Sequence, residues 1–224
     1  MTKVKICGLK KIEHAIIAAE SGADFLGFVF VEGVRRAISP KLATEIIIEF
    51  RKIHKRASPK LIGLFSNQEA SFVNQVIKSC GLDIVQLCGQ EDPSYWPTIN
   101  CSIIKQIKVG GPVGIDSNKK IADEVNLVAT AGHIALLDSY EPGKHGGTGH
   151  SFDWSIATSI ANTNDFILAG GLNDGNINEA INTVRPWAVD VSTGVETDGD
   201  KDDAKIMNFI ESVRSTDKQI KKSK

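Results

Sequence analysis

Three glycine-rich segments contain the residue types that most directly suggest chemistry. They lie at 146–149 (GGTG), 169–176 (AGGLNDGN) and 192–196 (STGVE). Glycine lets backbone N–H groups approach an anion closely, and serine and threonine hydroxyls can donate further hydrogen bonds to it. One such segment would be weak evidence, but the three together favour a phosphate site. The candidate phosphate-binding residues are Gly147, Gly170, Gly171, Ser192, Thr193 and Gly194.

Three ionisable residues stand in or at the end of strongly apolar runs, where a charge is costly unless it is paired or used. They are Lys5, Asp138 and Asp190. If the runs are strands, Lys5 shares a face with Cys7, because side chains alternate along a strand. Asp190 could simply form a structural ion pair with Lys5, and Asp138 could simply cap a strand end. Cys7 taken alone would be an inert core thiol.

These residues belong to a regular series of short apolar runs. The runs lie at 4–7, 25–30, 61–65, 83–88, 102–109, 133–138, 166–172 and 188–194. They are rich in Val, Ile, Leu and Phe without alternation, which is typical of parallel strands buried on both faces. The amphipathic segments between them predict helices, and the helix at 40–53 has Ser39 as its cap and Pro40 in its first turn. A short helix is expected near 91–97, a weak one before Gly132 and a last one over about 202–213.

Eight strands followed by helical sequence in about 215 residues predict a (β/α)8 TIM barrel of the phosphate-binding type. We expect one domain over 1–214 and a frayed polar tail over 215–224. A doubly wound sheet would more often have about five or six strands, and no Gly-x-Gly-x-x-Gly turn follows the first strand. The working groups of a TIM barrel lie at the C-terminal ends of its strands, which is where Cys7, Gln86, Cys88 and Asp138 occur.

The composition limits the classes of function. A net charge of −1 and a pI near 6.5 give no reason to expect nucleic acid or a membrane surface as partner. No apolar run could span a bilayer and the first residues do not resemble a secretory signal, so we expect a cytoplasmic protein. The four cysteines form no Cys-x-x-Cys pair, and no two of the five histidines have metal-ligand spacing, so no metal is expected. The expected partner is a small phosphorylated molecule, and the chain could be a monomer or a homodimer.

Over 4 to about 213 the sequence resembles the phosphoribosylanthranilate isomerase family of tryptophan biosynthesis. Any one matching block could be chance, but eight in order make the resemblance specific. The blocks are KICGLK, GADFLGFVF leading to RRAISP, GLFSN, DIVQLCGQE, LLDS, GGTGHSFDW, LAGGLN and VDVSTGVE leading to KD.

The resemblance implies an aldose–ketose isomerase, an intramolecular oxidoreductase. It would carry out the Amadori rearrangement of N-(5-phosphoribosyl)anthranilate to 1-(2-carboxyphenylamino)-1-deoxyribulose 5-phosphate, without metal or organic cofactor. It further implies Cys7 as general base, Asp138 as general acid and Arg36 as the contact of the anthranilate part, with Arg35 a competitor. A carboxyl with a raised pKa suits the acid, and Lys5 could lower the pKa of the Cys7 thiol.

Two positions depart from the family pattern. Cys88 stands where the family commonly has histidine, and Ala37 stands where an aromatic residue is common. Gln86 and Cys88 are expected to line the substrate pocket, whereas Lys5 and Asp190 are expected to support the site from beneath. Two alternatives stay open: another phosphate-binding barrel isomerase or epimerase, with metal histidines or paired aspartates, or a catalytically silent barrel that binds a phosphorylated ligand.

Overall fold

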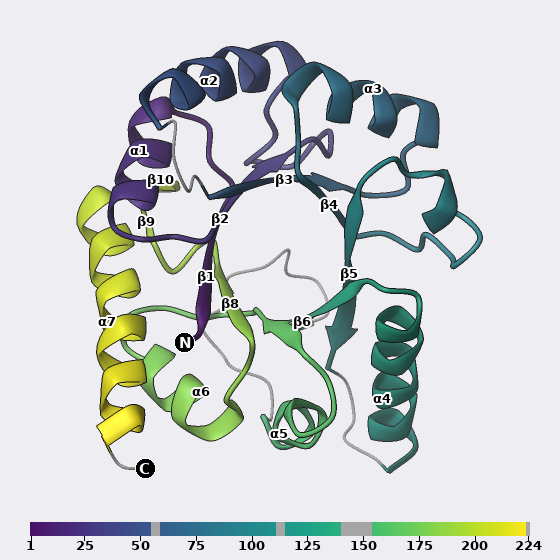
Figure 1. Ribbon diagram of the computed structural model, residues 1–224, viewed down its shortest axis with the longest axis vertical. Coiled ribbons are helices and arrows are strands. Elements are labelled where there is room, and N and C mark those ends of the chain that lie inside the picture. The colour runs from purple at the N-terminus through teal and green to yellow at the C-terminus, as the bar shows by residue number, and fades with distance from the viewer. Residues whose placement is uncertain (55–58, 111–114, 140–153, 223–224) are drawn as a thin grey trace.

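Eight parallel strands form a closed barrel in the order of the sequence, each bonded to the next and the last to the first. The computed structural model describes residues 1–54, 59–110, 115–139 and 154–222, and Figure 1 shows the barrel inside its ring of helices. The strands are β1 (Lys3–Cys7), β2 (Phe25–Val29), β3 (Lys60–Phe65), β4 (Ile84–Leu87), β5 (Ser102–Val109), β6 (Ile134–Ser139), β7 (Phe166–Leu168) and β8 (Ala188–Val191). The predicted TIM barrel is confirmed.

The apolar strand residues divide between two cores. One lies inside the barrel and includes Phe25, Ile62, Ile104, Leu136 and Ile167, each less than 5% exposed. The other lies between the outer face of the barrel and the helices. Strands that bury both faces need apolar residues at successive positions, which is why the runs show no alternation.

The helices follow the strands as the amphipathic segments predict. They are α1 (Ile12–Glu20), α2 (Pro40–Ile53), α3 (Ala70–Cys80), the 3-10 turn η1 (Trp96–Thr98), α4 (Ile115–Thr130), α5 (Ser155–Ala161), α6 (Ile177–Val184) and α7 (Asp203–Lys222). Ser39 caps α2, since the N–H of Leu42 donates to its Oγ at 3.2 Å. The weak helix before Gly132 is a full helix of 16 residues, α4.

The segment after 214 differs from the expected frayed tail, because α7 continues to Lys222. Thr216 and Asp217 on this last part are buried. The carboxylate of Asp217 accepts hydrogen bonds from the backbone N–H of Thr2 at 2.7 Å and from its hydroxyl at 2.9 Å. A polar sequence is therefore ordered here because the start of the chain supplies its partners.

A small hairpin precedes the last helix. Its strands are β9 (Glu196–Thr197) and β10 (Asp200–Lys201), antiparallel to each other. Asp198 and Gly199 form the turn with positive φ angles of 51° and 86°. Lys201 is only 6% exposed, so the hairpin folds one of its charges inward.

Within the described ranges no helix is long and apolar enough to cross a membrane.

Candidate active site

A buried ion pair joins β1 to β8 inside the barrel. Lys5 lies opposite Asp190 in the strand register, and its Nζ donates to Asp190 Oδ2 at 2.9 Å. The Lys5 side chain is fully buried, and burial favours its neutral form, but the charges of Asp190 and Cys7 and their hydrogen bonds with Lys5 together outweigh burial and raise the pKa of Lys5. The second oxygen, Asp190 Oδ1, is buried with no hydrogen-bond partner among the described residues. The structural ion pair of Asp190 with Lys5, one of the two interpretations of Asp190, is present.

Cys7 ends β1 and is 5% exposed. Burial raises the pKa of its thiol, and the Asp190 charge adds to the rise, while Lys5 and Lys201 act in the opposite direction. Lys5 therefore lowers the pKa of Cys7 as expected, but burial has the larger effect. The net shift is upward and favours the thiol. Spacing alone places a cation near Cys7 and says nothing of how completely water is removed.

Asp138 lies near the end of β6, at the same rim of the barrel as Cys7. Burial raises the pKa of Asp138 to about 6, helped by the Asp190 charge and opposed by Gln106, Lys5 and Lys108. The side-chain N–H of Gln106 donates to Asp138 Oδ2 at 2.5 Å. A carboxyl with this pKa holds its proton in part near neutral pH, which suits a proton donor.

The glycine loops after β7 and β8 lie side by side. Gly170 and Gly171 have φ angles of +90° and +66°, and a Cβ on Gly170 would lie 2.3 Å from Ser139 Oγ. Asn173 and Gly194 form a parallel bridge, and a Cβ on Gly194 would lie 2.0 Å from the Leu172 oxygen. Side chains are excluded at both positions, so backbone forms this part of the rim. Gly147 lies outside the described residues.

Ser192 connects the loop after β8 to the end of β1. Its hydroxyl donates to the backbone oxygen of Cys7 at 3.2 Å, and Lys201 donates to the backbone oxygen of Ser192 at 2.8 Å. Thr193 is next in the loop, and its backbone oxygen accepts the N–H of Glu196 at 3.0 Å. Lys201 is a candidate site residue that the sequence does not single out, because it lies in a run of charges that looks solvated.

Arg36 crosses the end of β1 at Gly8. Gly8 has φ +81°, and a Cβ there would lie 2.5 Å from Arg36 Cδ and 3.3 Å from Ser192 Oγ. Arg36 therefore lies within reach of the loops already described. Arg35 turns the other way, with 49% of its side chain exposed and a hydrogen bond from Nη1 to the backbone oxygen of Gly199.

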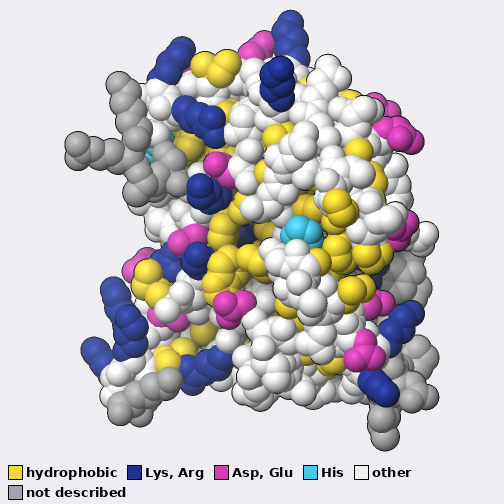
Figure 2. All heavy atoms as spheres, turned by 45° about the vertical axis from the view of Figure 1, so that its right-hand side comes forward, with side chains coloured by type: hydrophobic (Ala, Val, Ile, Leu, Met, Phe, Trp, Pro, Cys, Tyr) yellow, Lys and Arg dark blue, Asp and Glu magenta, His cyan; other side chains and the backbone are white. Residues whose placement is uncertain are grey.

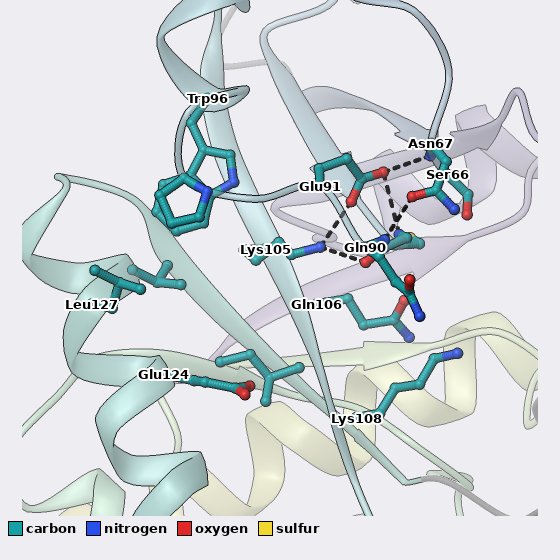
Figure 3. A pocket seen from close by; sticks show the side chains of 15 residues that line it. Ser66, Asn67, Gln90, Glu91, Trp96, Lys105, Gln106, Lys108, Glu124 and Leu127 are labelled. Carbon is teal, nitrogen blue, oxygen red and sulfur yellow. Dashed lines mark hydrogen bonds and ion pairs between the residues drawn. The ribbon is translucent and has the colours of Figure 1, made fainter.

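A cavity of about 640 Å³ opens on the side of β4, η1, β5 and α4. Figure 2, which brings this side forward, shows apolar side chains around a hollow, and Figure 3 shows its lining. Cys88 and Gln106 line it, so the cavity reaches the rim where Gln106 holds Asp138. Gln86 donates to Cys88 Sγ at 3.4 Å, and Gln86 Oε1 is buried with no partner in the described ranges.

The other side of the cavity is built around an ion pair that sequence reasoning did not single out. Lys105 Nζ lies 2.8 Å from Glu91 Oε2 and also donates to the Gly89 oxygen at 2.6 Å. Glu91 in turn accepts the N–H of Asn67 at 2.7 Å (Figure 3). No group of three or more His, Cys, Asp or Glu side chains in the described part of the chain is placed to hold a metal ion.

Comparison with known proteins shows the family of this chain. Residues 4–212 match the sequence model of the family described as N-(5'-phosphoribosyl)anthranilate (PRA) isomerase. The N-(5'-phosphoribosyl)anthranilate isomerase of Geobacter sp. (strain M21) is 42% identical over 211 residues, which are 94% of this chain and 97% of that protein.

Solved structures of proteins with this name have the same fold as this chain. The crystal structure of phosphoribosyl anthranilate isomerase from Thermotoga maritima matches with a TM-score of 0.83 and 34% identity, over 96% of this chain and 100% of that chain. A crystal structure of phosphoribosyl anthranilate isomerase in complex with reduced 1-(o-carboxyphenylamino)-1-deoxyribulose 5-phosphate matches with a TM-score of 0.79 and 32% identity, covering 96% and 100% of the two chains.

Proposed function

Because the chain belongs to the N-(5'-phosphoribosyl)anthranilate isomerase family, we propose that it isomerises N-(5'-phosphoribosyl)anthranilate in tryptophan biosynthesis. The product is 1-(2-carboxyphenylamino)-1-deoxyribulose 5-phosphate, so the reaction moves hydrogen within one molecule. The observation that carries the proposal is the presence of Cys7 and of Asp138, a carboxyl of raised pKa, on the same rim that also holds the glycine loops.

Ring opening is the step for Asp138. Its proton goes to the furanose oxygen, the C1–O bond breaks, and the nitrogen lone pair forms a C1=N bond. The product of this step is a protonated Schiff base. The pKa of about 6 leaves a fraction of Asp138 protonated near neutral pH, and the hydrogen bond from Gln106 occupies Oδ2 so that Oδ1 can carry the proton.

Proton removal from C2 is the step for Cys7. The thiolate takes the proton, the C2–H electrons form a C1=C2 bond, and the Schiff base nitrogen recovers its lone pair. The resulting enol then becomes the ketone by gaining a proton at C1 and losing one from the C2 hydroxyl. The positive Schiff base beside C2 adds to the Lys5 and Lys201 charges that favour the Cys7 thiolate, which compensates for burial when substrate is present.

The remaining residues bind the two anionic ends of the substrate. Arg36 takes the anthranilate carboxylate, and the backbone of Gly170, Gly171 and Gly194 with the hydroxyls of Ser192 and Thr193 takes the phosphate. Gln86 and Cys88 line the pocket between them. Lys5 and Asp190 support Cys7 from inside the barrel and touch no reacting atom.

The test is a coupled assay. The unstable substrate is made in situ from anthranilate and phosphoribosyl pyrophosphate with the matching transferase, and the loss of its fluorescence is followed after the protein is added. Acceleration is expected, and Cys7→Ser and Asp138→Asn should each lower kcat by at least about 100-fold. No acceleration by the wild-type protein would contradict the proposal and leave the silent barrel or another isomerase of the same fold.

A further inference from the structure

Glu196, the first residue of β9, is the centre of a cluster of cations. Its side chain is 6% exposed, and its carboxylate accepts hydrogen bonds from Arg36, Arg35 and Lys201. Burial opposes its ionisation, but these three partners outweigh burial and lower the pKa of Glu196 to about 2. Glu196 is therefore ionised at every pH at which the protein would work, and its charge is fixed in place.

The contact with Arg36 uses only one edge of the guanidinium. Nε donates to Glu196 Oε1 at 2.7 Å, and Nη2 donates to Oε2 at 3.2 Å. A guanidinium has five N–H donors, so two on Nη1 and one on Nη2 remain. Among the described residues none of these three has a partner. They form the second edge of the fork, which has the geometry to hold a planar carboxylate through two parallel hydrogen bonds.

We propose that Glu196 is a positioning residue for Arg36: it holds the Nε edge of the guanidinium and thereby presents the opposite edge to the ring carboxylate of the substrate. This inference rests on the proposed function and adds to it a residue that fixes recognition of the carboxylate. Arg36 has several rotatable bonds, and a side chain held before binding loses less freedom when the ligand arrives.

Lys201 extends the same cluster to the phosphate side. Its Nζ lies 2.8 Å from Glu196 Oε1 and also donates to the backbone oxygen of Ser192 at 2.8 Å. Lys201 contacts this loop through its own bond to the Ser192 oxygen, which does not involve Glu196, so a change at Glu196 acts first on the arginine. Glu196 faces three positive charges, so two positive charges remain uncompensated within the cluster, which suits a ligand with a carboxylate and a phosphate.

The cluster also decides between the two neighbouring arginines. Arg35 donates one hydrogen bond to Glu196 and one to the Gly199 oxygen of the hairpin turn, and 49% of its side chain is exposed to solvent. Arg36 has 20% of its side chain exposed and lies over Gly8, directly after Cys7. Arg36 is therefore the arginine that faces the site, and Arg35 holds the hairpin that carries Glu196.

The test measures binding, so that it does not depend on turnover. Two ligands are titrated by calorimetry: reduced 1-(o-carboxyphenylamino)-1-deoxyribulose 5-phosphate, and the same compound without its ring carboxylate. Glu196→Gln should weaken binding of the first ligand by at least about tenfold and change binding of the second by less than about twofold. Arg36→Met should give the same selective loss, and adding Glu196→Gln to it should cause no further loss.

The matched control is Glu91→Gln, which breaks another buried carboxylate–lysine pair of the same 2.8 Å separation, away from Arg36. It should leave the ratio of the two affinities unchanged. Thermal unfolding verifies that each variant is folded. Should Glu196→Gln not fold, Glu196→Asp keeps the charge but withdraws it by one methylene, and it should show the same selective loss.

Two outcomes would overturn the inference. Equal weakening of both ligands by Glu196→Gln would mean a general structural role, and additive losses in the double variant would mean that Glu196 does not act through Arg36. Failure of the proposed function looks different. A wild-type protein that distinguishes the two ligands but does not accelerate the reaction would contradict the isomerase and leave the positioning role intact.

Discussion

Gln106 on β5 donates its side-chain N–H to Oδ2 of Asp138 on the neighbouring strand β6, over 2.5 Å. The bond does two things at once. It fixes which carboxyl oxygen faces away from Gln106, and it favours the ionised form, which restrains the rise of the Asp138 pKa caused by burial. The Gln106 amide thus affects both the orientation of the Asp138 carboxyl and its pKa.

Replacing Gln106 with leucine should therefore raise the pKa of Asp138 above its value of about 6. It should also lower kcat by about tenfold, because the acid loses its orientation. The pKa is read from the pH titration of the aspartate carboxyl carbon by 13C NMR, and kcat from the coupled assay. Gln90→Leu, at an exposed residue of the same cavity, is the control and should leave both values unchanged. An unshifted titration in Gln106→Leu would show that the bond is not formed in solution.

Asp138 should cost the protein stability at neutral pH. A carboxyl whose pKa rises from 3.8 to about 6 binds its proton more tightly in the folded state than in the unfolded state. The folded state is therefore penalised progressively as pH rises between these values, and the penalty is complete above about pH 6, reaching at most about 3 kcal/mol. Asp138→Asn should be more stable than wild type in urea unfolding at pH 8 and equal to it near pH 3.5. Equal stability at both pH values would contradict the raised pKa.

Cys7 should react slowly with iodoacetamide at pH 7, and its rate should keep increasing with pH beyond 9, since burial raises its pKa above the ordinary thiol value of 9.0. Lys201→Met removes a charge that favours the thiolate, so the rate at a fixed pH should fall by roughly threefold. Lys105→Met, which removes another lysine with little exposure, 11% of its side chain, is the control and should not change the rate. Modification at Cys7 is measured by peptide mass spectrometry. A faster reaction in Lys201→Met would show that the sign of its effect is wrong.

Gly8→Ala should damage both stability and binding of substrate. The substitution strains a residue at φ +81° and drives a Cβ into Arg36 Cδ at 2.5 Å. We expect a loss of about 1–3 kcal/mol in the free energy of unfolding and an increase in KM as Arg36 is displaced. Gly22→Ala separates the two effects, because Gly22 has φ +96° but nothing within 4 Å of its added Cβ. It should lose stability without a change in KM.

The barrel could be predicted from the sequence because strands buried on both faces leave a direct record in their composition. Leu26, Leu61 and Val85 are each in such a run and each at most 1% exposed. The ends of β7 and β8 could not be placed so well. The run at 166–172 ends as a strand at Leu168, because Gly170 and Gly171 adopt positive φ angles that a strand does not use.

The partners within the site were harder to predict than its residues. Lys201 lies in a hairpin of two-residue strands whose charged sequence carries no periodic signal, so its burial depends on Glu196 and Ser192 being in place. Gln106 looks like one polar residue in a strand, and only the register with β6 brings it to Asp138. The pKa of Cys7 depends on burial, which the spacing of Lys5 and Cys7 does not contain.

The contact of β1 with β8 is the seam at which the barrel closes, and the proposed active site straddles it. Lys5 and Asp190 are 185 positions apart, as are Cys7 and Ser192, and Thr2 and Asp217 are 215 apart. Contacts of such separation carry the largest loop-closure entropy and depend on the intervening chain to bring them together. In a chain whose first six or seven strands have formed but whose β1 and β8 are not yet paired, Cys7 lacks its neighbours on β8. The proposed phosphate loop at Ser192 is then not next to Cys7 either. Activity therefore requires the completed barrel, and we expect a partly folded chain to be inactive.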